Sequence, residues 1–107
     1  MTKPLRTEEE ADRELEEAVR WYEAKRSGLG AELLASVDVT LEQVVRFPGT
    51  GTPVPRVPAG LPVRRRPVEK FPYHVVYLET ADAIRVLAFA HTRRRPGYWL
   101  TRTAPRK

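Results

Sequence analysis

The stretch YHVVYLETADAIRVLAFAH, residues 73–91, holds two runs of β-branched and aromatic residues with a short break between them. Such residues favour strands, and the break TAD at residues 80–82 is short enough for a hairpin connection. Alternate residues of a strand point to opposite faces of a sheet, and both faces of YHVVYLE are largely apolar. We therefore expect residues 73–79 to form a central strand that pairs with residues 84–91.

A further strand is predicted immediately before this hairpin, in the segment LPVRRRPVEKF at residues 61–71. Its Pro67 has no backbone N–H to donate, so we expect this strand to be an edge or to be bulged at the proline. The segment PGTGTPVPRVPAGLP, residues 48–62, is rich in Pro and Gly and indicates a loop that brings the chain round from the elements before it.

Two amphipathic helices are predicted before that loop. Apolar residues recur at helical spacing up to about Arg26, and Thr7 and Glu10 have the spacing of a capping box at the start of this helix. A second helical pattern runs from Gly30 until Pro48 ends it. Because only the short stretch SGLG joins the two, we expect them to form an antiparallel hairpin.

Together these elements predict a single α+β domain over residues 1–107, with an N-terminal helical hairpin packed on a small antiparallel β-sheet. A chain of 107 residues is long enough for one modest core but not for two. Its hydrophobic fraction of 41% and charged fraction of 31% are ordinary for a globular protein, so disorder of the whole chain is not expected.

The composition argues against several classes of function. The absence of cysteine excludes a disulfide framework and thiolate metal sites, and two histidines leave too few ligands for a typical transition-metal site. No run of residues approaches the roughly 18 apolar residues that cross a bilayer. No glycine motif of the phosphate-cradling type follows a strand and opens a helix. We expect a cytoplasmic protein that uses no cofactor, binds no metal and contacts no membrane.

The charge is divided unevenly along the chain. Residues 1–45 hold 6 basic and 11 acidic side chains, whereas residues 46–107 hold 13 basic and 3 acidic ones. The densest basic cluster is HTRRRPGYW, residues 91–99, at the end of the most strand-like segment, and a second triplet of arginines lies at residues 64–66. Such asymmetry favours a basic face that meets an anionic partner, either nucleic acid or an acidic protein surface.

Alternating side chains of residues 64–66 must point to opposite faces, so if this strand neighbours either of the other two, at least one of its arginines is expected to join the C-terminal cluster. A purely structural reading remains open for both triplets, because arginines at a solvated strand edge discourage strand-to-strand aggregation.

Three longer strings make the sequence similar to a known family: EEAVRWYEAKRSGLGAELL, VRRRPVEKFPYHVVYLE and IRVLAFAHTRRRPGYW. Their combination resembles the RelE/ParE toxin superfamily of bacterial toxin–antitoxin modules over roughly residues 7–102. The pattern FPY followed by H-x-x-R-x-P-x-Y-W looks closer to the ParE-like branch. The resemblance implies a helical hairpin on a small antiparallel sheet, with an N-terminal strand for which residues 3–6 are available.

Two activities follow from the resemblance. ParE-like members poison DNA gyrase by binding, which implies a target-binding surface in this chain. Its expected residues are Arg64, Arg65, Arg66, Arg93, Arg94, Arg95 and Trp99. RelE-like members are ribosome-dependent mRNA endoribonucleases, which need an acid, a base and cations around the reacting phosphate. For that alternative the candidate residues are His91, Arg93, Arg65 and Tyr98, with no metal.

The resemblance also implies a cognate antitoxin protein, for which Trp21 and Tyr22 on the first helix are candidate contacts. Each aromatic or imidazole candidate has a structural reading beside the functional one. His91 at a strand end is often a hydrogen-bonded structural residue, Tyr98 and Trp99 are able to pack on the sheet, and Trp21 and Tyr22 are able to belong to the core. An inactive homologue or a basic nucleic-acid-binding module is a third class that the sequence leaves open.

Overall fold

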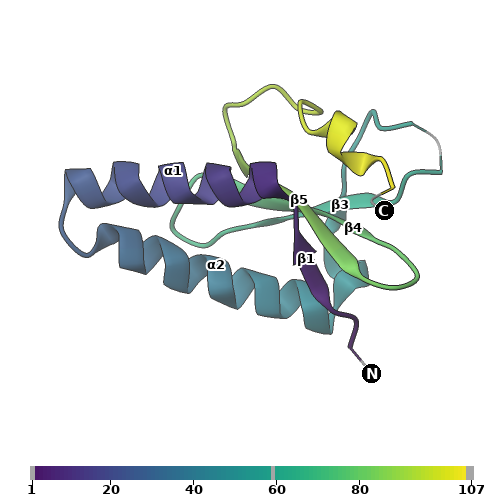
Figure 1. Cartoon of the computed structure of the whole chain (residues 1–107), viewed down its shortest axis with the longest axis horizontal. Coiled ribbons are helices and arrows are strands. Elements are labelled where there is room, and N and C mark those ends of the chain that lie inside the picture. The colour runs from purple at the N-terminus through teal and green to yellow at the C-terminus, as the bar shows by residue number, and fades with distance from the viewer. Residues whose placement is uncertain (1, 59, 106–107) are drawn as a thin grey trace.

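The computed structural model describes residues 2–58 and 60–105 of the 107-residue chain. In chain order the elements are β1 (Leu5–Thr7), α1 (Glu9–Lys25), α2 (Leu29–Arg46), the 3-10 turn η1 (Pro48–Thr50), β2 (Thr52–Pro53), β3 (Val63–Pro67), β4 (Tyr73–Glu79), β5 (Ile84–His91) and the 3-10 turn η2 (Leu100–Thr103). The predicted α+β class with its N-terminal helical hairpin is confirmed, and Figure 1 shows the two helices side by side against the sheet. No helix among the described residues is long and apolar enough to cross a membrane.

The sheet has the strand order β1-β5-β4-β3-β2, and it is mixed rather than antiparallel. β3, β4 and β5 form the predicted antiparallel meander, while β1 lies parallel to β5 with Leu5 opposite Ile84. The N-terminal strand that the family resemblance implied is therefore present. β3 has β2 beside it only at Arg64 and Arg65, so Pro67 lies where the outer side of the strand has no neighbour in the sheet.

The predicted capping box at Thr7 and Glu10 is wrong. Thr7 belongs to β1, and α1 begins after Glu8, which caps the helix without a side-chain hydrogen bond. The reason is the pairing with β5, because Glu8 donates its backbone N–H to the carbonyl of Val86 at 3.0 Å and holds the chain extended up to that point. The acidic residues of the first turn still face the positive end of the helix dipole.

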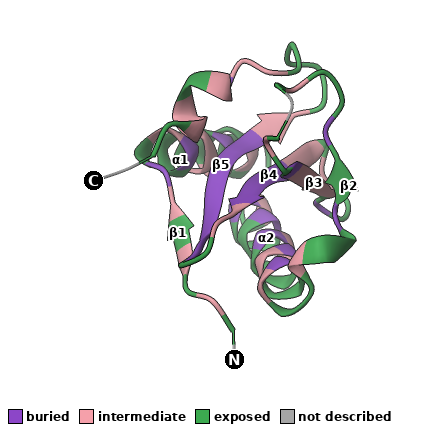
Figure 2. Cartoon of the chain, turned by 90° about the vertical axis from the view of Figure 1, so that its right-hand side faces the viewer, coloured by how far each residue is buried: buried purple, intermediate pink, exposed green. Residues whose placement is uncertain are grey.

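A hydrophobic core lies on each face of the sheet. The helices cover one face, where Leu33 and Val37 of α2 pack with Val75 and Tyr77 of β4. The other face is covered by the Pro-rich loop and by the turn that carries Trp99, which packs with Val76 of β4. Because both faces are covered, β4 and β5 are buried along most of their length, as Figure 2 shows.

A β-bulge in β5 changes which residues face the helices. Val76 lies opposite Ala88 and Tyr77 opposite Val86, so Leu87 has no partner of its own across the pair. Leu87 and the next residue, Ala88, accordingly both belong to the core on the far side from the helices. Past the bulge the alternation is reversed, which brings His91 to the α1 side, where its ring contacts that of Tyr73 edge to face.

The turn that follows α2 is held by two hydrogen bonds to the buried hydroxyl of Tyr77. This hydroxyl donates to the carbonyl of Pro48 at 2.6 Å and accepts from the backbone N–H of Gly51 at 3.1 Å. A Cβ on residue 51 would lie 2.9 Å from Cζ of Tyr77, closer than two such atoms normally approach.

Gly51→Ala is therefore expected to lower the free energy of unfolding by about 1 to 3 kcal/mol, since the turn or the ring must shift. Urea unfolding measures this change. Gly49→Ala is the matched control, because a Cβ at residue 49 has no atom within 4 Å. Equal stability of the two variants would contradict the assigned contact.

Candidate functional site

The basic segment after β5 is a turn held by backbone hydrogen bonds. The N–H of Thr92 donates to the carbonyl of Pro72 at 2.8 Å, and the N–H of Arg94 donates to the carbonyl of His91 at 2.9 Å. The N–H of Arg93 donates to Nδ1 of the His91 ring at 3.0 Å. The side chains of Arg93, Arg94 and Arg95 are thus presented by a fixed backbone at the end of a buried strand.

Glu14 of α1 ties the C-terminal segment to the edge of β5. Its carboxylate accepts from the hydroxyl of Tyr98 at 2.6 Å and from Arg102 at 2.9 Å, and from the backbone N–H of Phe89 at 3.2 Å. Arg102 also donates to the carbonyl of Leu87 at 3.0 Å. These two side chains therefore bind backbone groups of β5 at the positions beyond the end of its pairing with β1.

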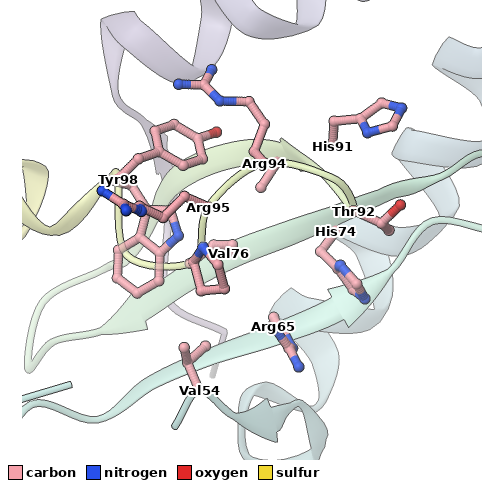
Figure 3. Close-up of a pocket in the computed structure, with 12 residues that line it drawn as sticks. Val54, Arg65, His74, Val76, His91, Thr92, Arg94, Arg95 and Tyr98 are labelled. Atoms are coloured by element: carbon pink, nitrogen blue, oxygen red, sulfur yellow. The ribbon is translucent and has the colours of Figure 1, made fainter. Parts of the chain in front are cut away.

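Tyr98 is a structural hydroxyl in this arrangement. Burial raises its pKa, and the hydrogen bond to the negative Glu14 carboxylate raises the pKa further. The guanidinium of Arg94 lies 3.7 Å from the centre of the Tyr98 ring and 3.8 Å from the Glu14 carboxylate. Figure 3 shows Arg94 turned toward the α1 side, away from its neighbour Arg95.

A second buried ion pair, between Arg85 and Glu8, holds the turn η2 against the sheet. Arg85 of β5 lies 3.3 Å from the Glu8 carboxylate and donates to the carbonyl of Arg102 at 2.7 Å. Its side chain is 9% exposed. The position of η2, and with it the turn that holds the arginines, is thus set by contacts with β5 and with the start of α1.

The basic cleft lies on the face of the sheet opposite the helices. It is a small cavity of about 60 Å³, drawn in Figure 3, and its apolar lining includes Val54, Val76 and Trp99. Arg65 of β3 and Arg95 from the turn after β5 line it. Its lining contains no carboxylate, and across residues 2–58 and 60–105 neither Arg65 nor Arg95 forms an ion pair.

His74 lines the same cleft from β4, beside Arg65. Its pKa is lowered, first because burial disfavours the charged imidazolium and second because the positive Arg65 repels it. The neutral imidazole is therefore the form that this site favours near neutral pH.

His74 is expected to make the fold less stable in mild acid. Since its pKa is lower in the folded than in the unfolded chain, stability falls as the pH drops below about 6.5 and levels off below the folded-state value. His74→Gln should reduce this loss of stability between pH 7 and pH 5, as measured by thermal unfolding at a series of pH values. An unchanged pH profile would contradict the assignment. His91→Gln serves as the control at the chain's other histidine.

The two neighbours of Arg65 point to the opposite face of the sheet. Arg64 donates to the carbonyl of Gly51 at 2.7 Å, while Arg66 donates to Gln43 at 3.1 Å and also contacts the Thr50 hydroxyl. The expectation that at least one arginine of this triplet meets the C-terminal cluster is met by Arg65 alone. Arg64 and Arg66 instead form hydrogen bonds with the end of α2 and the turn that follows it.

The aromatic candidates divide into core and surface. Trp99 is 2% exposed and packs in the core on the cleft side, which agrees with the structural reading of this residue and contradicts its place in the target-binding surface. The turn after Gly97 and the start of η2 fold it back onto the sheet. Tyr22 packs edge to face with Phe71 in the core on the helix side, whereas Trp21 is 57% exposed.

The candidates for nuclease chemistry do not form one acid–base cluster. Arg65, His91 and Tyr98 all border the basic cleft, but the ring of His91 lies on the α1 side against Tyr73. The Tyr98 hydroxyl, however, is bound to Glu14, and Nδ1 of His91 accepts from the backbone of Arg93. Within the described part of the chain, no group of three or more His, Cys, Asp or Glu residues is placed to hold a metal ion.

Glu14 and Arg102 are the site residues that the sequence did not indicate. They lie 88 residues apart, and neither belongs to a local pattern that predicts a contact. Only the three-dimensional arrangement shows that they determine where the arginine turn lies.

The fold is similar to that of a chain in the chromosomal ParDE TA system from P. aeruginosa. The TM-score is 0.70 at 14% sequence identity, and the match covers 83% of this chain and 95% of that chain. No protein-family model and no curated protein sequence matches the chain. The comparison thus supports the helical hairpin and sheet as a shared fold.

Proposed function

We propose that this protein is the ParE-like toxin of a type II toxin–antitoxin module, which inhibits growth by binding DNA gyrase in the cytoplasm. The observation that carries the proposal is a set of guanidiniums without ion pairs, presented by a strand and by a hydrogen-bonded turn: Arg65, Arg93 and Arg95. Among the described residues none of these three forms a salt bridge, whereas Arg85, Arg94 and Arg102 do. The resemblance of the sequence and the likeness of the fold support the same assignment.

A binding role fits the chemistry better than a hydrolytic one. The hydroxyl of Tyr98 already donates to Glu14, and its raised pKa opposes its use as a proton donor or acceptor near neutral pH. The ring of His91 is turned toward Tyr73 and is bound to the backbone through Nδ1. The fold therefore uses both groups for structural contacts.

The proposed target-binding surface is smaller than the sequence suggested. It consists of Arg65, Arg93 and Arg95, while Arg64, Arg66 and Arg94 contact the protein itself and Trp99 is buried. Charged groups at the rim of an interface mainly increase the rate of association and select the partner. An acidic surface of gyrase, or the DNA that gyrase holds, has the complementary charge.

The proposed antitoxin contacts lie on the helical hairpin. Trp21 is 57% exposed at one edge of α1, and α2 exposes 40% of Leu34 and 52% of Val39. A groove lined by Leu15, Val19 and Leu34 runs between the two helices. Trp21 lies on another side of α1, where it lines a separate pocket with Glu17 and Tyr73. Apolar anchors of an antitoxin would bury side chains of these two sites, and Trp21 is the residue expected to contribute most.

One observation favours a RelE-like nuclease as the second candidate. His74, held in its neutral form, lies beside Arg65, and a neutral imidazole next to a fixed cation is suited to removing a proton near a phosphate. In that case the partners would be the ribosome and its mRNA.

A pair of assays separates these functions. The purified protein is added to gyrase supercoiling reactions and, in parallel, to translating ribosomes whose mRNA is mapped by primer extension. We expect loss of supercoiling activity with gyrase-linked DNA breaks and no cleavage of mRNA. Codon-positioned cuts would replace the proposal with the nuclease, and no effect in either assay would favour an inactive homologue or a plain nucleic-acid-binding module.

Charge reversal tests the surface itself. Arg93→Glu and Arg95→Glu should each abolish most growth inhibition when the protein is expressed without an antitoxin. Arg13→Glu is the matched control, because Arg13 is an exposed arginine on α1 near Glu9. Full toxicity of both turn variants would exclude this surface.

A further inference from the structure

The basic cleft combines features that suit a bound oxyanion. Two guanidiniums without a carboxylate partner, those of Arg65 and Arg95, line a cavity whose other lining is largely apolar. An anion placed over an apolar floor is screened less by water, so its attraction to each guanidinium is stronger than on an open surface. Guanidinium groups also match the geometry of phosphate oxygens, to which they donate in pairs.

The size of the cavity limits the ligand. A volume of about 60 Å³ has room for a small charged group but not for a base or a bulky side chain. The rings near it are not available for stacking, since Trp99 is 2% exposed and Arg94 covers the ring of Tyr98. The cleft is therefore suited to a backbone group of a polymer rather than to a base.

No carboxylate in the lining of the cleft competes with an anion for Arg65 and Arg95. The pKa of His74 is lowered, so its neutral form is favoured. In that form the ring can donate one N–H to the anion without adding a positive charge that would repel Arg65. Arg94 also lines the cleft, but its guanidinium is turned toward Glu14 and lies over the Tyr98 ring. The two unpaired guanidiniums come from different elements, β3 and the turn after β5, and Figure 3 shows them toward opposite ends of the cleft. A phosphate group bound by both would draw the two side chains in over the apolar floor.

From these observations we infer that the basic cleft binds one phosphodiester group of DNA, between the guanidiniums of Arg65 and Arg95. The inference rests on the proposed function, because it specifies the DNA held by gyrase as part of what the toxin contacts. The remaining surface arginine, Arg93, lies outside the cleft and would contact a neighbouring phosphate or the enzyme.

The test is direct binding of the full chain to a fluorescent 20-base-pair DNA duplex at several salt concentrations, without gyrase. For wild type, the logarithm of the affinity should fall linearly with the logarithm of the salt concentration. The double variant Arg65→Gln/Arg95→Gln should bind at least about tenfold more weakly, and its salt slope should be smaller by about one, because one phosphate contact is lost.

A control with the same loss of charge separates this site from a general charge effect. Arg13→Gln/Arg46→Gln removes two arginines that are exposed on the helices and lie 3.6 and 3.7 Å from carboxylates. Its slope should stay within about half a unit of wild type. If the control lost as much affinity as the cleft variant, the cleft would not be the phosphate site.

Two further measurements test whether the cleft recognises phosphate rather than negative charge in general. Arg65→Lys/Arg95→Lys keeps the charge and is expected to keep the salt slope but to bind more weakly, because lysine cannot donate in pairs. Poly-L-glutamate of equal charge should compete less well than unlabelled duplex, and equal competition would overturn the assignment to phosphate.

The inference and the proposed function fail in different ways. If Arg65→Gln/Arg95→Gln bound DNA like wild type, the phosphate site would be wrong even if the protein inhibited gyrase. If wild-type protein bound DNA through the cleft but left gyrase active, the site would stand and the gyrase assignment would fall.

Discussion

Glu14→Ala should lower the free energy of unfolding by about 3 to 5 kcal/mol, the range found when one partner of a buried ion pair is removed. Glu14 and Arg102 are only 15% and 13% exposed, and the same carboxylate accepts from Tyr98 and from the backbone of Phe89. The substitution would leave a buried guanidinium, a hydroxyl and an N–H without their acceptor. Urea and thermal unfolding measure the loss, which corresponds to a fall in Tm of at least about 10 °C.

Glu17→Ala is the matched control for this variant, since Glu17 is an exposed residue of the same helix. Its stability should remain within about 0.5 kcal/mol of wild type. Glu14→Gln should be intermediate, because an amide oxygen can still accept but does not neutralise Arg102. A Glu14→Ala protein as stable as Glu17→Ala would contradict the role given to the carboxylate.

The second large effect is expected at Trp99, where alanine should cost about 3 to 5 kcal/mol of stability. The indole fills the core on the cleft side beside Val76 and Leu87, and the turn with the arginines lies directly before it in the chain. Removing it leaves a cavity under the basic cleft. Chemical unfolding followed by circular dichroism measures the loss.

Trp99→Phe separates packing from direct contact with a target. Because Trp99 is 2% exposed, this variant should lose less stability than the alanine variant and retain gyrase inhibition within about twofold. Trp21→Phe is the comparison at the exposed tryptophan. If Trp99→Phe folded normally but lost its inhibitory activity, the indole would have to contact the target after all.

Most of the fold could be predicted because its main elements have strong local patterns. Both helices and the three longer strands follow from apolar periodicity and β-branched runs, and β4 packs apolar side chains on both faces of the sheet as expected. The residue patterns do not indicate the short strands β1 and β2, and only the family resemblance implied a strand at the N-terminal end. β1 has three residues, and its extended form depends on a parallel partner some 80 residues away, so no local pattern marks it.

The site could be predicted only in outline. Strand alternation correctly separates Arg65 from Arg64 and Arg66, but the bulge at Leu87 reverses the alternation near His91 and has no signal in the sequence. Trp99 was placed in the target-binding surface through the ParE-like resemblance, with packing on the sheet as the alternative, and the turn at Gly97 returns it to the sheet. Which arginine is paired depends on Glu14, whose position only the folded α1 determines.

The parallel pairing of β1 with β5 has a consequence for synthesis. Leu5 is synthesised some 80 residues before its partner Ile84. Until then β1 has no neighbour, α1 lacks the strand on which it packs, and the apolar stripe of the hairpin stays uncovered. The nascent chain thus passes through a long interval in which its helices need protection from aggregation, and closure of the sheet is a late, non-local step.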